Sequence, residues 1–262
     1  DIGFFGAAVL EDGRLRFNSK VPSVRLQHAA PRIHLVVFDL SNASLMRRVL
    51  DPALPYRENL LGDIVAKSQP FHGVQIDFEA VPAQEGPRFI EFLRELKSRL
   101  GESKPLSVAL PARRSRASDA YDYAAVASIA DRIVIMAYDQ HWSTSGPGPV
   151  ASIPWCREIA LFAKSHIPEE KLIMGLPLYG RSWQNIGSHR SVRYNQVRNI
   201  ISSSRARPQY HPDNGPYLEY GRKVTVKVFF EDAVSLFDKL SMYKHLGVTM
   251  VSFWRVGQEP RQ

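Results

Sequence analysis

Two carboxylates stand in an otherwise apolar stretch of the sequence, FHGVQIDFEAV at residues 71–81. The alternation around Ile76 and Phe78 is typical of a β-strand, in which residues two positions apart point to the same face. Asp77 and Glu79 are therefore predicted to share one face. Neighbouring like charges repel and acidic residues are disfavoured in strands, so this pair costs stability. Carboxylates perturbed in this way cluster at functional sites.

A second interpretation of the same stretch requires no chemistry. A half-buried strand turns its polar side to water, and Gln75, Asp77 and Glu79 would then be the solvent-exposed side. The spacing alone does not separate the two interpretations. The decision depends on the segments that position this strand.

The composition indicates an ordinary globular chain that can bury a sizeable core. Of its 262 residues, 44% are hydrophobic and 23% are charged, so we expect one domain over residues 1–262. No apolar run is long enough to span a bilayer and no basic-then-apolar leader opens the chain, so no integral membrane association is expected. The single Cys156 excludes an internal disulfide and leaves the redox compartment open.

The net charge of +8 raises the question of nucleic acid. The basic residues are dispersed and no nucleic-acid recognition motif is present, so nucleic acid is not an expected partner. A basic surface equally suits an anionic cell wall. Arginines concentrate at 112–119 and 180–208, and we interpret both stretches as solvated loop faces rather than phosphate clamps.

Strand-like runs alternate with helix-like segments along the chain, a pattern typical of a βα architecture with a parallel sheet. Strands are expected at 2–10, 32–40, 71–81, 105–113, 131–139, 171–180 and 248–256. Helices are expected at 42–50 with an irregular continuation to 69, and at 86–100, 120–130, 155–167 and 232–247. The segment at 86–100 carries a core-facing stripe at helical spacing, formed by Phe89, Phe92, Leu93, Leu96 and Leu100.

Chemically capable residues recur where the predicted strands end. Besides the carboxylate pair, these are Tyr138, Asp139, Tyr179, Arg181 and Trp254. In a (β/α)8 TIM barrel the active site lies at the carboxyl ends of the strands, so this α/β fold is predicted. Seven barrel strands can be assigned, and the remaining one, the first of the eight, is expected to be missing from this chain. Residues 183–224 are too long for a plain connection and are expected to be an irregular insertion, with some structure of its own, before the last helix and strand.

Four motifs, in order along the chain, resemble those of glycoside hydrolase family 18, which includes chitinases, chitinase-like lectins and bacterial cell-wall N-acetylglucosaminidases. HGVQIDFE at 72–79 resembles the family's Asp-Gly-x-Asp-x-Asp-x-Glu strand, and MAYD at 136–139 resembles its Met-x-Tyr-Asp strand. GLPLYGRSW at 175–183 resembles its Gly-x-Pro-x-Tyr-Gly-Arg strand, and FW at 253–254 resembles its final strand. The resemblance implies the same barrel and a glycosidase.

The first motif departs from the family pattern at two positions. Gly73, Asp77 and Glu79 match it, whereas His72 and Gln75 stand where the family has its two earlier Asp residues. Members from the bacterial spore cortex and cell wall often lack the middle Asp, so the resemblance is to that branch. Gln75 is included among the residues expected to bind substrate.

The resemblance implies substrate-assisted catalysis, in which the N-acetyl oxygen of the substrate is the nucleophile. Glu79, with its pKa raised by burial and by the neighbouring charge, would protonate the leaving oxygen. Asp77 would hold the acetamido N–H and stabilise the oxazolinium intermediate. Tyr138 would donate to the acetamido oxygen and position it. Asp139 would bind a sugar hydroxyl or share a proton network with Asp77.

Aromatic and basic residues complete the expected binding site. Trp254 is the first choice to stack under a sugar, and Trp142 is also included among the residues expected to bind substrate. Trp183 is a further candidate in a flanking loop, and from residue type alone core packing is favoured for both Trp142 and Trp183. Tyr179 and Arg181 would contact sugar hydroxyls or an acidic substituent such as the muramic lactyl group, and Arg181 could equally pair with a barrel carboxylate. No cofactor is expected. His141 beside Asp139 lacks the further ligands that a metal site needs.

The sequence therefore predicts a retaining hydrolase of β-1,4 bonds in N-acetylglucosamine-containing polysaccharides. Peptidoglycan is the first choice, chitin oligosaccharides are the second, and an extracytoplasmic location follows from either. The alternative is a non-catalytic chitinase-like lectin that binds the same glycans. Lectin-like members commonly lose the catalytic Glu, so the presence of Glu79 favours the enzyme. The oligomeric state stays open.

Overall fold

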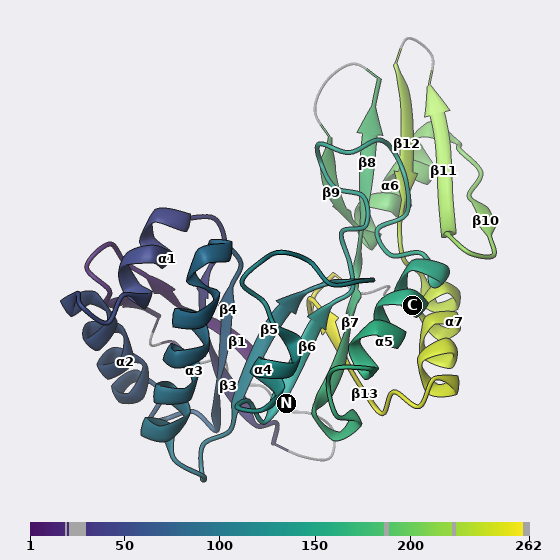
Figure 1. The fold of residues 1–262 in the computed structure, drawn as a ribbon. Coiled ribbons are helices and arrows are strands. Elements are labelled where there is room, and N and C mark those ends of the chain that lie inside the picture. Colours follow the sequence, from purple (N-terminus) through teal and green to yellow (C-terminus); the bar gives the residue numbers. More distant parts are fainter. Residues whose placement is uncertain (19, 21–29, 186–188, 222–223, 259–262) are drawn as a thin grey trace. The chain divides into compact units, whose positions relative to one another are not determined.

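The computed structural model describes residues 1–18, 20, 30–185, 189–221 and 224–258. The chain divides into two compact units, which are described separately (Figure 1). The first unit comprises Asp1–Pro111, Arg116–Val134 and His166–Lys171, and the second comprises Ala112–Ser115, Ile135–Ser165 and Leu172–Gln262. Within the described part of the chain, no helix combines the length and the apolar character needed to cross a membrane.

The first unit contains a parallel sheet in the order β1-β3-β4-β5, with the short β2 antiparallel to β1. The strands are β1 (Ile2–Val9), β2 (Leu15–Phe17), β3 (Ile33–Asp39), β4 (Gly73–Phe78) and β5 (Leu106–Pro111). The helices are α1 (Ala43–Leu50), α2 (Pro55–Lys67), α3 (Gly86–Leu100) and α4 (Tyr123–Ala127), with single 3₁₀ turns η1 (Ala83–Glu85) and η2 (Glu169–Lys171).

The helices of this unit begin and end where local chemistry dictates. The side chain of Asn42 caps α1 by accepting from the Leu45 N–H at 2.9 Å, and Pro55 opens α2. The predicted apolar stripe of α3 is buried at all five positions, and the helix stops at Gly101, whose φ of 71° requires a residue without a side chain. The helix expected at 120–130 is shorter than predicted because Asp122 caps it from inside that range.

Strand β6 (Arg132–Met136) is divided between the units. The first residues of β6 belong to the first unit, where this strand comes after β5 in the sheet order. Its last residues belong to the second unit, where the order is β13-β7-β6. There β7 (Leu172–Pro177) pairs in parallel with β13 (Met250–Trp254), and α5 (Ile153–Lys164) and α7 (Ala233–His245) belong to the same unit. All seven predicted barrel strands are thus present.

The second unit also contains an inserted antiparallel sheet in the order β10-β11-β12-β8-β9. Its elements are β8 (Tyr179–Gln184), β9 (Arg190–Arg193), α6 (Tyr194–Ser204), β10 (Gln209–His211), β11 (Gly215–Gly221) and β12 (Thr225–Phe229). The range expected to be an irregular insertion, 183–224, begins inside β8, ends just before β12 and contains β9, α6, β10 and β11. Residues 186–188 and 222–223 within it are outside the described part.

One prediction at the edge of this sheet is wrong. The barrel strand expected at 171–180 ends at Pro177, and Tyr179 already belongs to β8 of the inserted sheet. Gly180 makes this possible, because a side chain there would lie 2.2 Å from the carbonyl oxygen of Phe229 on β12. Tyr179 and Arg181 are therefore positioned by the inserted sheet.

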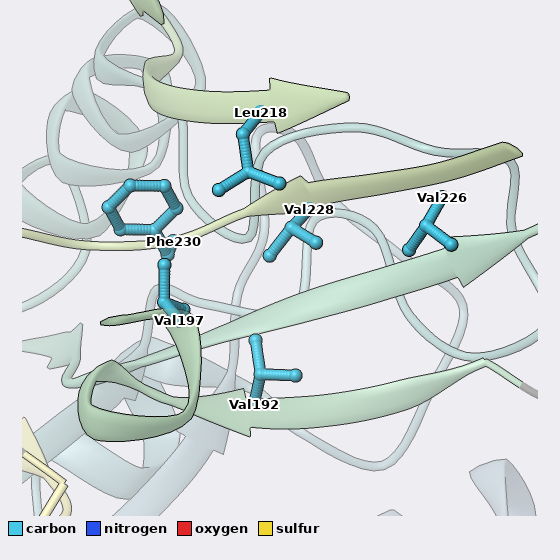
Figure 2. Packing of buried hydrophobic residues seen from close by; sticks show 6 residues of the cluster. All are labelled: Val192, Val197, Leu218, Val226, Val228 and Phe230. Carbon is cyan, nitrogen blue, oxygen red and sulfur yellow. The ribbon is translucent and has the colours of Figure 1, made fainter. Parts of the chain in front are cut away.

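The inserted sheet has a core of its own on one face, formed with α6. Figure 2 shows the six buried side chains of this core, Val192, Val197, Leu218, Val226, Val228 and Phe230. Val197 comes from α6 and the others come from β9, β11, β12 and the residue that follows β12. Because strand residues alternate between faces, the side chains between these positions point to the opposite face.

Candidate active site

The two carboxylates of the opening motif differ in their surroundings. Asp77 lies in β4 opposite Phe38 of β3 and is 4% exposed, and no group of the described residues donates a hydrogen bond to its Oδ1. Glu79 follows the last residue of β4, and its side chain is exposed. Its N–H donates to the carbonyl oxygen of Asp39 at 2.9 Å, which continues the β3–β4 ladder by one residue. The expectation that Glu79 is buried is therefore wrong.

Burial instead perturbs the pKa of Asp77. It raises the pKa of this carboxyl to about 7, and the nearby negative charge of Glu79 adds to the effect. Desolvation together with a neighbouring like charge is the cause that was predicted for Glu79. In the structure these two effects raise the pKa of Asp77, the residue inside the strand. A carboxyl with a pKa near neutrality can release and accept a proton under physiological conditions.

The backbone between the two carboxylates is held firmly. The ring of Phe78 points to the opposite face and packs against Phe89 and Phe92 of α3, with ring centroids 6.2 and 5.8 Å away. Tyr121 Oη donates to the carbonyl oxygen of Phe78 at 2.8 Å and accepts from the N–H of Val81 at 3.1 Å. Sequence reasoning missed Tyr121, because these bonds span about 40 residues of chain.

Gly73, the glycine at the start of this strand, has a packing role. A side chain at Gly73 would lie 2.5 Å from the imidazole of His34 on the neighbouring strand β3. His72 before it uses Nδ1 to accept from the N–H of Ile33 at 3.0 Å. Gln75 is half-buried in β4, two residues before Asp77. The first part of the motif therefore fixes the strand, and its last part presents the carboxylates.

The perturbed Asp77 predicts a pH-dependent stability. Its pKa in the folded protein, about 7, lies above its ordinary value of 3.8, so the folded state holds a proton that the unfolded state releases between these values. The free energy of unfolding should therefore fall as the pH rises through this window. Asp77→Asn removes this loss, which amounts to about 4 kcal/mol at most, at about 1.4 kcal/mol per pH unit.

Urea denaturation of wild type and Asp77→Asn at pH 4, 6 and 8 measures this effect. The variant should gain stability relative to wild type between pH 4 and 7 and keep a constant advantage above that range. Glu85→Gln, which removes a carboxyl paired with Arg88 in the same unit, is the control for the loss of a carboxyl as such. Parallel pH profiles of wild type and Asp77→Asn would contradict a raised pKa.

The second unit brings a further group of predicted residues together. Asp139 follows β6 with a φ of 60°, and its Oδ1 accepts from Tyr179 Oη at 2.6 Å. The same oxygen accepts from Arg181 Nε at 3.1 Å and Nη2 at 2.7 Å. Arg181 thus pairs with a carboxylate at the end of a barrel strand, one of the two roles expected for it. Burial, followed by the charge of Asp139, raises the pKa of Tyr179.

Tyr138 is positioned by the same group. Its ring meets that of Tyr179 edge to face with centroids 6.4 Å apart. A side chain at Gly175 of β7 would lie 3.0 Å from the Tyr138 ring and 2.8 Å from the carbonyl oxygen of Ile135, so this glycine makes room for the ring. The guanidinium of Arg181 lies 5.8 Å from the centroid of the Tyr179 ring. Tyr138 and Asp139 are therefore oriented by β7 and β8.

The tryptophans in this unit have different environments. Trp183 is 2% exposed and donates through Nε1 to the carbonyl oxygen of Ser145 at 3.1 Å, so the packing interpretation is confirmed for it. Trp142 is 49% exposed, and the packing interpretation is wrong there. Trp254 at the end of β13 is half-buried, and the guanidinium of Arg255 lies 6.0 Å from its ring centroid.

The nearby His141 makes a bond within its own loop. Its Nδ1 lies 2.8 Å from the carbonyl oxygen of Pro149. Within the residues that the structure describes, no three His, Cys, Asp or Glu side chains are grouped to hold a metal ion. The predicted residues thus form two separate groups, a carboxylate pair within the first unit and a tyrosine–aspartate–arginine group within the second.

These motifs belong to a known family. A family model described as glycosyl hydrolases family 18 matches residues 58–259 of the chain. The chain belongs to this family. The resemblance drawn from its motifs is therefore confirmed.

Relatives and solved structures of family 18 support the same assignment. The chain is 33% identical over 215 residues to the putative sporulation-specific glycosylase YdhD of Bacillus subtilis (strain 168), covering 76% of this chain and 51% of the relative. It is 28% identical to the cortical fragment-lytic enzyme of Bacillus anthracis over 197 residues, covering 70% and 46%. The chain thus spans about half the length of the curated relatives it matches.

The fold is shared with a solved structure. The spore cortex-lytic enzyme SleL of Bacillus cereus matches at a TM-score of 0.85 and 25% identity, covering 98% of this chain and 64% of that one. Structures of this family have the TIM-barrel type of fold, so the fold predicted from the strand ends is confirmed.

Proposed function

We propose that this family 18 chain hydrolyses β-1,4 bonds of N-acetylglucosamine-containing glycans with retention of configuration, and that peptidoglycan is its substrate. The observation that carries the proposal is the pair at the end of β4, a buried Asp77 with a pKa of about 7 next to an exposed Glu79. An exposed carboxyl can reach a bound glycosidic oxygen, and a buried neighbour with a shifted pKa can exchange a proton beside it.

The mechanism assigns one role to each side chain. Glu79 donates its proton to the leaving glycosidic oxygen, while the acetamido oxygen of the substrate attacks the anomeric carbon. Asp77 accepts a hydrogen bond from the acetamido N–H, and in its charged form it stabilises the oxazolinium ion. Glu79 then removes a proton from the water that opens this ion. The hydroxyl of Tyr138 holds the acetamido oxygen in the attacking position.

The names of the relatives support a cell-wall substrate. Two of the curated relatives are named a putative sporulation-specific glycosylase and a cortical fragment-lytic enzyme, whereas the curated probable chitinase 2 of Drosophila melanogaster matches over a shorter part of the chain, 45%. The basic character of the chain, with a net charge of +8, also suits an anionic wall polymer.

Product analysis on two substrates tests the proposal. The protein is incubated with purified peptidoglycan and with chitin oligosaccharides, new reducing ends are counted, and the anomer of the fresh product is recorded by NMR. Faster cleavage of peptidoglycan, with N-acetylglucosamine at the new reducing ends and retained configuration, is expected. Binding of both glycans without cleavage of either would instead favour the lectin, and inverted product would exclude the substrate-assisted route.

Tyr138 provides a separate test of positioning. Tyr138→Phe should lower kcat by about 10- to 100-fold and change KM little, because its hydroxyl acts on the acetamido oxygen during attack. Tyr210→Phe is the matched control, since this tyrosine on β10 is 44% exposed and bonds to Asp238. Steady-state kinetics on a soluble glycan measures both. A rise in KM with unchanged kcat would contradict the proposed role of Tyr138.

A further inference from the structure

A small cavity lies in the second unit beside strands β8 and β12 of the inserted sheet, which Figure 1 labels. Its volume is about 240 Å³. It is lined by Ser145, Gly146, Pro147, Trp183, Gln184, Asn185, His189, Thr225 and Lys227. The volume is below the usual range for a drug-sized ligand and suits one sugar substituent or ring.

The strand register places this cavity on the face of the sheet that α6 does not cover. Trp183 of β8 lies directly opposite Lys227 of β12, and directly opposed residues share a face. The adjacent Val228 points to the other face, where it joins the core that Figure 2 shows with Val197 of α6. The cavity is therefore separate from the apolar core of the inserted sheet.

The cavity has a cation at its wall. Lys227 Nζ lies 3.2 Å from Glu219 Oε2, and the two side chains are 48% and 46% exposed. Glu219 does not line the cavity. An ion pair this exposed is weak, and an ammonium group has three donors, so a ligand carboxylate can bind Lys227 beside Glu219. His189 accepts a weak bond from the Gln184 N–H at Nδ1, at 3.4 Å, which leaves Nε2 to act as a donor.

The exposed Trp142 is attached to the same cavity wall. The N–H of Ser145 donates to the carbonyl oxygen of Trp142 at 3.1 Å, and Ser145 Oγ accepts from the N–H of Trp142 at 3.0 Å. The buried Trp183 fixes this turn through its bond to the Ser145 carbonyl oxygen. A tight turn thus presents a large exposed aromatic side chain next to a polar cavity, a combination that suits ligand binding more than packing.

We propose that this cavity receives the carboxylate-bearing 3-O-substituent of an amino sugar that stacks on Trp142, with Lys227 as the charged partner of the carboxylate. Arg181, the other cation expected to bind an acidic substituent, already forms an ion pair with Asp139. The inference rests on the proposed function and identifies the residue that binds the lactyl carboxylate of the N-acetylmuramic acid in the proposed peptidoglycan substrate. Lys227 is the specificity-determining residue.

Binding measurements in a protein that cannot turn over its ligand test this assignment. In a Glu79→Gln background, calorimetry compares three probes: the disaccharide of N-acetylglucosamine and N-acetylmuramic acid, its methyl ester, and N,N′-diacetylchitobiose. Adding Lys227→Gln should raise the Kd of the acidic disaccharide by about fivefold, the effect of about 1 kcal/mol from a half-exposed charged hydrogen bond. The Kd of the other two probes should not change.

A matched control removes a charge from the other face of the same sheet. Arg190 on β9 is exposed and lies opposite Ser182, not opposite Trp183 or Lys227, and Arg190→Gln should leave all three Kd values unchanged. Trp142→Ala should raise the Kd values of the acidic disaccharide and of chitobiose alike, because stacking of a sugar on the indole does not depend on the lactyl group.

Two results would overturn the assignment: equal binding of the acid and its methyl ester to the parent protein, or a Lys227→Gln change that affects all probes or none. These outcomes are independent of the proposed reaction. If glycans are cleaved but Lys227→Gln does not selectively weaken binding of the acidic disaccharide, the cavity assignment is wrong and the proposed function stands. If no glycan is cleaved and Lys227→Gln still selectively weakens binding of the acidic disaccharide, the proposed hydrolysis is wrong and the cavity assignment stands.

Discussion

Replacement of Glu79 by Gln is expected to lower the rate of glycan hydrolysis by about 10²- to 10⁴-fold, the usual contribution of a positioned general acid and base. The amide has almost the same shape as the acid but has no proton to donate to the leaving oxygen. The side chain is exposed beyond the end of β4, so the change should leave the folded structure intact. Reducing-end release from peptidoglycan, with equal thermal midpoints for both proteins, measures the effect.

Binding separates loss of chemistry from loss of substrate contact in this experiment. Glu79→Gln should bind N-acetylglucosamine oligosaccharides within a few-fold of wild type, although it hydrolyses them far more slowly. Glu85→Gln, another carboxyl close to β4 in the chain but paired with Arg88, should hydrolyse at the wild-type rate. Hydrolysis that survives in Glu79→Gln would remove this residue from the mechanism and with it the proposed function of the carboxylate pair.

The second large effect is expected on stability, at a buried ion pair that was not predicted from the sequence. Lys239 of α7 is 1% exposed, and its Nζ donates to both oxygens of Glu231, at 2.9 and 2.8 Å. Glu231 also accepts from Ser235 Oγ at 2.6 Å. This group joins the residues that follow β12 to the first turns of α7. It therefore anchors the end of the inserted sheet to the helix.

Lys239→Met should lower the free energy of unfolding by about 3–5 kcal/mol, because it leaves the carboxylate of Glu231 buried without its cation. The double variant Lys239→Met with Glu231→Gln removes both charges and should recover most of the loss. Urea denaturation measures each variant. Lys227→Met, which breaks an exposed pair in the same unit, is the control and should cost at most about 1 kcal/mol. A double variant that is less stable than the single one would contradict this explanation.

A signal for this pair was present in the sequence but was ambiguous. Lys239 falls four residues after Ser235 and four before Tyr243, so all three share one face of α7, and all three are buried. A lysine among buried positions of a helix requires an acidic partner. Glu231 lies eight residues away in sequence and outside the helix, so only the folded chain identifies it.

The sequence by itself determined the elements and the type of chemistry. Apolar periodicity located the strands of the barrel and the buried face of α3, because each depends on residues only a few positions apart. The spacing of Asp77 and Glu79 in a strand was enough to predict a shared face. The four ordered motifs were enough to identify the family, which the match over residues 58–259 confirms.

Only the tertiary structure decided how the chemical groups are surrounded. Burial falls on Asp77 and not on Glu79 because β4 ends between them, and Arg181 meets Asp139 across 42 residues of chain because β8 leaves the barrel strand order after Pro177. Trp183 is buried and Trp142 is exposed because the turn at Ser145 covers one ring and carries the other. Solvent exclusion and ion pairing depend on segments distant in sequence, and local patterns carry no information about them.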